Sequence, residues 1–147
     1  MTDDKNALAI ALFTEVMAAD QLVRARLSKV LPKGMEISHF TVLNHLARTT
    51  EERTPAQLAT TFQVTRGAMT NTLSKLEWAG YIHIRPDWDD ARRKLVAIST
   101  AGRQARDQAV GSITPVITQV VEELGDTRVR DALPILREMR LKLRQQP

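Results

Sequence analysis

The sequence predicts a mainly α-helical protein with one small β-hairpin. Hydrophobic residues make up 43% of the 147 residues but aromatic residues only 4%, which suits packed helices better than a strand-rich sandwich. Apolar residues recur at helical spacing over most of the chain, and this spacing changes to a two-residue alternation directly after Gly80.

The first helix is expected from Leu8 to Leu31, where apolar residues recur every three or four positions. The segment Pro32-Lys33-Gly34 should end it, because proline lacks an N–H donor and glycine accepts a positive φ. A helix this apolar needs a partner surface, and both interpretations stay open: a second copy of the chain, or the protein's own core.

A second helix is expected from about Ser38, as its N-cap, to Arg48. Two alternative sets of residues fit its buried face: Phe40, Leu43 and Ala47, or Val42 and Leu46.

Capping signals define the next two helices. In Thr54-Pro55-Ala56-Gln57, threonine and glutamine can form a capping box around a proline at the first helical position. After a three-residue turn, Thr65 should cap a helix that runs to about Ala79, with Gly80 in a left-handed conformation at its end.

The alternating segment predicts a hairpin. Its first strand is expected at residues 81–85 and its second at 94–98, joined by a long charged tip. A helix should begin at Thr100, where Pro115 is expected to kink it or split it in two. The chain should restart after Gly125 in a last helix that contains Pro134 as a local irregularity.

A short capped helix, a turn, a second capped helix and a charged hairpin together outline a winged helix-turn-helix. If Met69 points inward, 100° per residue turns the second helix's small polar residues outward. No acidic residue occurs from Thr65 to Leu76, and the chain carries 21 basic against 17 acidic residues, which mildly favours a polyanionic partner. Side chains of this kind can contact base edges or phosphates, so the predicted DNA-binding residues are Thr65, Arg66, Gly67, Thr70, Asn71, Ser74 and Lys75. The alternative is an ordinary solvated helix face.

The hairpin tip supplies a second set of candidates. Arg92 can enter a narrow minor groove while Asp90 orients it or braces the hairpin. Arg93 and Lys94 can reach the flanking phosphates. The alternative is a network of surface ion pairs with little effect on stability.

Two segments give a more specific resemblance. Leu76-Glu77-Trp78-Ala79-Gly80-Tyr81-Ile82-His83-Ile84-Arg85 resembles the end of the recognition helix and the first wing strand of the MarR family. Asp90-Ala91-Arg92, five residues, then Ile98-Ser99 is similar to that family's wing motif, and Gly102 keeps the spacing of the region that follows.

The resemblance implies a homodimeric transcription regulator that binds a pseudo-palindromic operator in double-stranded DNA. A cytoplasmic protein is expected separately, because the first residues, with Asp3 and Asp4, lack the positive charge of a signal peptide. It further implies a repressor released by a small aromatic or phenolic effector. The expected organisation is an N-terminal dimerisation helix at 1–34, a DNA-binding lobe at 35–102 and C-terminal dimerisation helices at 103–147. Pro115 and Pro134 lie in those helices, so the geometry of the dimer layer stays open.

Other classes are disfavoured. There is no cysteine, and no motif of a nucleophile elbow, phosphate loop or dinucleotide site, so no catalytic residue and no cofactor is predicted. His39, His45 and His83 lack metal-ligand spacing. Trp78, Trp88, Phe13 and Phe40 are expected to pack rather than line a ligand site. No apolar run approaches the ~20 residues of a membrane span, so no membrane partner is expected. A winged-helix module that binds proteins instead of DNA remains the alternative function.

Overall fold

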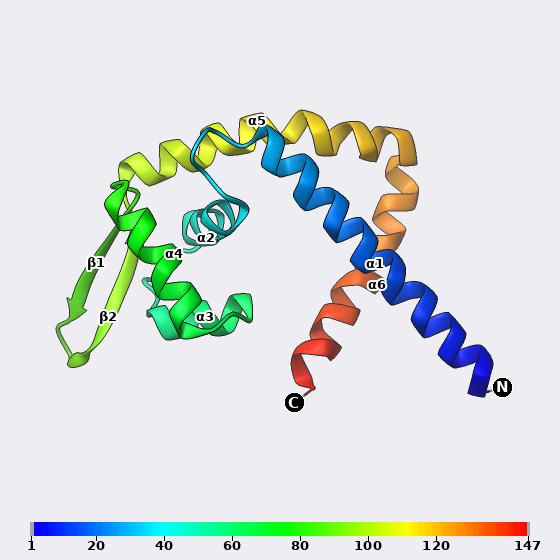
Figure 1. Cartoon of the computed structure of the whole chain (residues 1–147), viewed down its shortest axis with the longest axis horizontal. Helices are drawn as coiled ribbons and strands as arrows, with labels where there is room; N and C mark the ends of the chain where they lie inside the picture. The colour runs from blue at the N-terminus through cyan, green and yellow to red at the C-terminus, as the bar shows by residue number, and fades with distance from the viewer. Residues whose placement is uncertain (1, 147) are drawn as a thin grey trace. The chain divides into compact units, whose positions relative to one another are not determined.

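The computed structural model describes residues 2–146, which form six helices and one two-stranded antiparallel sheet (Figure 1). In chain order the elements are α1 (Thr2–Val30), α2 (Ile37–Ala47), α3 (Pro55–Phe62), α4 (Arg66–Trp78), β1 (Ile82–Asp87), β2 (Asp90–Ile98), α5 (Thr100–Leu124) and α6 (Asp126–Gln145). The chain forms two compact units, which divide between Ser112 and Ile113. The predicted fold class, mainly α with one small hairpin, is confirmed.

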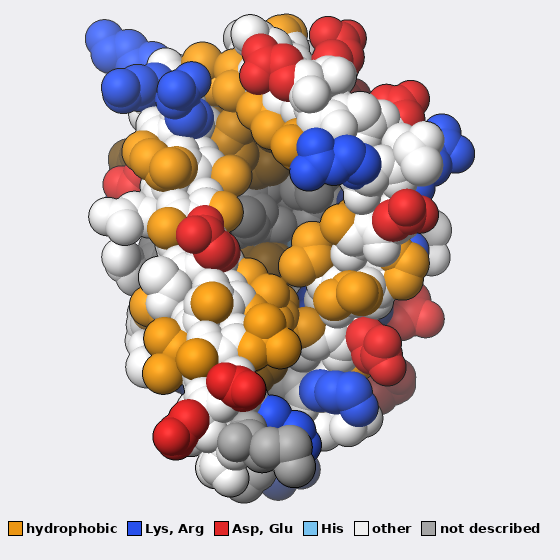
Figure 2. Space-filling model, turned by 90° about the vertical axis from the view of Figure 1, so that its right-hand side faces the viewer, with side chains coloured by type: hydrophobic (Ala, Val, Ile, Leu, Met, Phe, Trp, Pro, Cys, Tyr) orange, Lys and Arg blue, Asp and Glu red, His pale blue; other side chains and the backbone are white. Residues whose placement is uncertain are grey.

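The first helix is longer than predicted and has no buried residue. It begins at Thr2 rather than Leu8, because Asp3 and Asp4 in its first turn interact favourably with the positive end of the helix dipole. Its large apolar side chains are open to solvent, Leu8 at 72% and Met17 at 70%. Apolar side chains lie exposed among charged ones on the side of the molecule where α1 begins (Figure 2).

The length of α1 corrects one expectation. Among residues 2–146, α1 is a helix long and apolar enough to cross a membrane by length and composition. The expectation that no apolar stretch approaches that length is therefore wrong. Length and composition do not distinguish a membrane span from a helix whose apolar face is covered by another protein chain.

The first unit has one hydrophobic core, built by α2, α3, α4 and the hairpin. The predicted inner stripe of α4, Met69, Leu73 and Leu76, is buried as expected. The buried residues of α2 come from both predicted sets, Leu43 from one and Val42 and Leu46 from the other, and His39 is buried as well. The buried residues of this core are Val42, Leu43, Leu46, Leu58, Ala59, Met69, Leu73, Leu76, Ile82 and Val96.

Capping fixes where the short helices begin. The Thr54 hydroxyl accepts a hydrogen bond from the Gln57 N–H at 3.1 Å, and the Thr54 N–H donates to Gln57 Oε1 at 2.9 Å, which confirms the predicted capping box. The N-cap of α2 is Glu36, not Ser38. Glu36 replaces the serine because its own N–H donates to Nδ1 of His39 at 3.1 Å, an unusual capping box with histidine at the third position.

The hairpin is longer than its apolar pattern predicts. The strands stay paired from Ile82 with Ile98 as far as Pro86 with Lys94, and the turn is only Trp88-Asp89. The long tip predicted for residues 86–93 is therefore wrong in part: Pro86 is still paired, and beyond it the register shifts so that Asp87 pairs with Asp90. Residues 91–93 form the bulge between the pairs Pro86–Lys94 and Asp87–Asp90, beyond the hydrophobic core.

Neither proline divides its helix. α5 is one helix from Thr100 to Leu124 with Pro115 inside it, and α6 likewise contains Pro134. Each proline removes one backbone donor, and the helix continues on both sides of it. The predicted restart after Gly125 is confirmed, with this glycine at φ +93° before α6.

Ser99 joins the end of α4 to the start of α5. Its hydroxyl donates to the Gly80 carbonyl at 2.6 Å and accepts from the Gly102 N–H at 2.9 Å. Its own N–H donates to the Tyr81 carbonyl at 2.9 Å. Three hydrogen bonds at one buried residue therefore fix how α5 leaves the lobe.

We expect mild acid to destabilise the fold through His39. Burial lowers the pKa of His39, with Lys75 adding to this effect and Glu36 opposing it. Because the unfolded chain binds the proton more readily, stability should be complete above pH ~6.5 and fall as the pH drops below it. Protonation also removes the acceptor for the Glu36 N–H, a bond worth about 1 kcal/mol.

Urea unfolding of the wild type and His39→Gln between pH 7.5 and 5 measures this effect. The wild type should lose more stability over this range than the variant. Equal losses would mean that His39 does not contribute.

Candidate nucleic-acid interface

The outer face of α4 is built by the same periodicity that buries its inner face. With Met69, Leu73 and Leu76 in the core, the helix turns small polar side chains to solvent. Every residue predicted on this helix is exposed: Thr65, Arg66, Gly67, Thr70, Asn71, Ser74 and Lys75. The face is therefore polar and accessible, and it carries no acidic residue before Glu77 in the last turn of the helix.

A tight turn precedes the N-terminal end of α4. Gln63 takes a left-handed conformation with φ +53°, and Thr65 caps the helix by accepting from the Ala68 N–H at 3.0 Å. The threonine hydroxyl keeps its own proton for a second partner. An exposed helix N-terminus of this kind attracts anions through its free N–H groups and its dipole.

The tip of the hairpin holds Arg92 close to Asp90. One oxygen of Asp90 accepts from the backbone N–H of Arg92 at 3.0 Å and from its Nε at 3.2 Å. These two bonds, first the backbone one, lower the pKa of Asp90, so the carboxylate stays ionised. The Arg92 side chain is nevertheless 90% exposed. Its guanidinium is oriented and remains open to a ligand.

A groove lies between α4 and the hairpin. Its volume is about 520 Å³. Among its polar lining residues, α4 contributes Thr70, Ser74 and Glu77, and the hairpin contributes Arg85, Arg93 and Lys94. The structure thus brings residues from both predicted sets around one hollow. Arg93 also approaches Asp87 at 3.8 Å, a longer ion pair.

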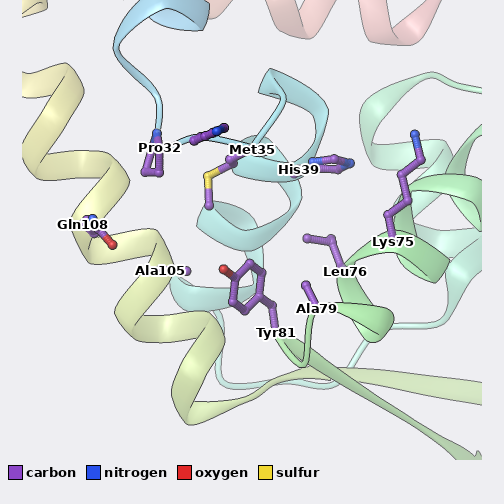
Figure 3. A pocket seen from close by; sticks show the side chains of 11 residues that line it. Pro32, Met35, His39, Lys75, Leu76, Ala79, Tyr81, Ala105 and Gln108 are labelled. Atoms are coloured by element: carbon purple, nitrogen blue, oxygen red, sulfur yellow. The ribbon is translucent and has the colours of Figure 1, made fainter.

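Other predicted residues lie elsewhere on the lobe. Asn71 and Lys75 line a second hollow of about 380 Å³, together with Arg24 and His39. Lys75 also borders a third hollow, of about 390 Å³. This hollow lies between the C-terminal end of α4, the first half of α5 and the segment that follows α1. Figure 3 shows Met35, His39, Leu76 and Tyr81 turned toward this hollow.

The two tryptophans do not pack as predicted. Trp78 is 94% exposed and Trp88 is 78% exposed. Trp78 follows Met69 by nine residues, which at 100° per residue places it on the opposite side of the helix. Helical periodicity therefore predicts that Trp78 is exposed. Phe13 is also partly exposed, and Phe40 is half-buried.

A link between Glu52 and Arg85 was not predicted. These residues form an ion pair with Nη2 2.6 Å from Oε1, although they are 33 positions apart. The pair depends on the three-dimensional approach of a loop and a strand, which no local pattern indicates. Among residues 2–146, no three histidine or acidic side chains gather as metal ligands.

The chain was compared with protein families and with known proteins. Residues 33–93, from the end of the first helix into the wing, match the sequence model of the MarR family. No curated protein matches the chain closely enough to count as a relative.

Solved structures match nearly the whole chain. A mutant MarR from E. coli in complex with operator DNA is 23% identical with a TM-score of 0.78, over 89% of this chain and 94% of its own. A MarR-family transcriptional regulator from Rhodococcus sp. RHA1 is 22% identical with a TM-score of 0.81, over 90% and 94%. CouR from Rhodococcus jostii RHA1, bound to p-coumaroyl-CoA, is 21% identical with a TM-score of 0.76, over 87% and 90%. At these identities the likeness establishes a common fold.

Proposed function

We propose that the protein is a sequence-specific regulator of transcription that binds duplex DNA. The premise is that residues 33–93 match the MarR family model and that the chain shares the winged-helix fold of solved MarR-family structures. One observation carries the proposal: the small polar side chains of the outer face of α4 and the basic edge of the hairpin border a single groove. A helix that enters the major groove and a wing that follows the adjacent backbone need this arrangement.

The α4 residues take distinct roles in the proposal. Thr70, Asn71 and Ser74 hydrogen-bond to base edges, since short polar side chains let the helix approach the floor of the major groove. Arg66 and Lys75 neutralise phosphates. Gly67 allows close approach of the backbone, and Thr65 donates its remaining hydroxyl proton to a phosphate.

The wing takes the minor groove. Arg92 enters it with its guanidinium oriented by Asp90, and A·T-rich tracts would favour this because their narrow groove concentrates negative potential. Arg93 and Lys94 bind the phosphates on either side. These assignments make the wing mainly a reader of DNA shape.

A homodimer completes the proposal. α1 buries none of its own residues, and α6 likewise has no buried residue, with Ile135 exposed at 63%. Residues 1–34 and 103–147 would supply the dimer layer and residues 35–102 the DNA-binding lobe. A two-fold dimer implies a pseudo-palindromic operator with half-sites ~34 Å apart. Covering the apolar face of α1 in this way also fits a cytoplasmic protein without a membrane partner.

We further propose that the protein is a repressor released by a small aromatic or phenolic effector. The hollow of about 390 Å³ bordered by Tyr81 and Lys75 lies in the size range of small-molecule sites. Such a ligand must favour a conformation that fits DNA poorly. A regulator rather than an enzyme is proposed because the solved structures that share this fold are described as regulators.

Selection from a pool of random duplexes tests the proposal. The purified protein should enrich a pseudo-palindrome, and Arg92→Ala should bind the selected duplex about tenfold more weakly. Its plot of log K against log salt concentration should be shallower by about one unit, because one cation no longer meets the DNA.

Lys5→Ala provides the control, since Lys5 is an exposed cation at the start of α1. It should leave both affinity and salt dependence unchanged. If no duplex is enriched even at low salt, the protein does not bind specific DNA, and a protein-binding module becomes the better interpretation.

A further inference from the structure

The loop between α2 and α3 is attached to both strands of the wing. On one side, the Arg53 N–H donates to the Val96 carbonyl at 3.3 Å, and the Val96 N–H donates back to Arg53 at 2.7 Å. On the other side, Glu52 binds the side chain of Arg85 in β1. Two adjacent loop residues therefore hold both strands of the hairpin.

Arg85 engages three neighbours at once. Its Nε and Nη2 donate to the two carboxylate oxygens of Glu52 at 3.1 and 2.6 Å. Its Nη1 donates to the Pro86 carbonyl at 3.0 Å. Its guanidinium carbon lies 5.6 Å from the centre of the Trp88 ring, within the range of a cation–π contact. The guanidinium is thus fixed in orientation by a bidentate pair and by the turn of the wing.

This cluster sits where the hairpin leaves the lobe. Arg85 pairs with Leu95, which is half-buried, and the next residue, Val96, is fully buried. Residues 91–94, on the outer side of this point, are all exposed. The direction in which the wing projects is therefore set at Arg85, and the proposed DNA-contacting cations lie beyond it.

Neighbouring carboxylates compensate the positive charge of Arg85. The hydrogen bond that Arg85 donates to Glu52 raises the pKa of Arg85, as do the neighbouring charges of Glu52, Asp87 and Asp89. A guanidinium neutralised in this way contributes little to a field that attracts phosphates. This distinguishes it from Arg92, which is almost fully exposed.

We propose that the Glu52–Arg85 ion pair is the positioning device of the wing, an acidic residue that strengthens DNA binding by holding the hairpin in its binding orientation. The inference rests on the proposed function. It assigns Glu52 and Arg85 as positioning residues, and neither contacts the DNA.

The sign of one substitution tests the proposal. Removing an acidic residue from a protein that binds a polyanion should strengthen binding if only charge matters. Glu52→Gln should instead weaken binding to the selected duplex roughly tenfold, because the hairpin must then be ordered at the moment of binding. Binding as tight as the wild type, or tighter, would overturn the proposal.

Glu51→Gln is the matched control. Glu51 is the neighbouring acid in the same loop and pairs only with Arg53 among the ion pairs of the described residues. It should bind DNA as well as the wild type or slightly better. Arg85→Gln should weaken binding as Glu52→Gln does, with the salt dependence of the wild type. A salt dependence that is shallower by about one unit would make Arg85 a phosphate contact and overturn its assignment.

A readout without DNA separates this inference from the proposed function. The chain has two tryptophans, so Trp78→Phe leaves Trp88 as the only one. In that background, Glu52→Gln should make Trp88 fluorescence more readily quenched by acrylamide while the thermal unfolding of the lobe stays cooperative. If no duplex is enriched, the proposed function fails, yet this measurement still decides whether the pair holds the wing. Unchanged quenching would show that it does not.

Discussion

Replacing Ser74 with glutamate is expected to weaken binding to the selected duplex at least about 100-fold, equivalent to ~2.7 kcal/mol. Ser74 lies exposed on α4 and borders the groove shared with Arg93 and Lys94. The substitution removes a hydroxyl proposed to contact a base and places a negative charge against the phosphates, a juxtaposition that costs several kcal/mol. A fluorescence anisotropy titration with labelled duplex measures the change.

The same substitution at Ser28 is its control. Ser28 is exposed on α1, so Ser28→Glu adds the same charge to the protein at a position without a proposed contact. It should alter affinity less than about threefold. If Ser74→Glu also binds within threefold of the wild type, with unchanged circular dichroism, α4 does not enter the major groove.

Replacing Gly102 with alanine is expected to destabilise the protein by about 3 kcal/mol, at the upper end for overpacking. A Cβ on Gly102 would lie far inside contact distance of the Tyr81 carbonyl oxygen and would also press on Ile98. Both neighbours are held in place, the carbonyl by a hydrogen bond from Ser99 and Ile98 by its pairing with Ile82. The backbone itself must therefore shift.

Gly111→Ala is the matched control in the same helix. Nothing lies within 4 Å of the Cβ that it would add. Because alanine favours helix more than glycine does, it should stabilise the protein by about 0.5–1 kcal/mol. Differential scanning calorimetry should show opposite shifts in Tm. Equal shifts would mean that the contact with Tyr81 does not limit α5.

Features determined by local chemistry were predictable from the sequence. The capping box at Thr54 and Gln57, the cap at Thr65 and the buried stripe of α4 all depend on residues three or four positions apart. Such spacing fixes which groups can hydrogen-bond or share a face, whatever the rest of the chain does.

Features that depend on distant neighbours were not predictable in the same way. The hairpin keeps its pairing as far as Pro86 and Lys94 and then shifts register to pair Asp87 with Asp90, where side chains carry no alternating pattern. Glu36 caps α2 only because His39 turns its ring nitrogen back toward it. Glu52 meets Arg85 only when the α2–α3 loop folds against β1.

The exposed tryptophans illustrate a different error. Large aromatic residues are usually at least partly buried, and this expectation outweighed the helical periodicity at Trp78. The geometry places Trp78 on the side of α4 opposite its buried stripe, so in this case the periodicity was the better guide.

The hydrogen bonds of Ser99 have a mechanical consequence. One buried side chain hydrogen-bonds to both the Gly80 carbonyl and the Gly102 amide. The end of α4 and the first turn of α5 are therefore rigidly connected. A change in the direction of the first turn of α5 would therefore also displace the Gly80 carbonyl at the end of α4. The orientation of the outer face of α4 is then governed by the pivot at Ser99, several turns away from Thr70 and Asn71.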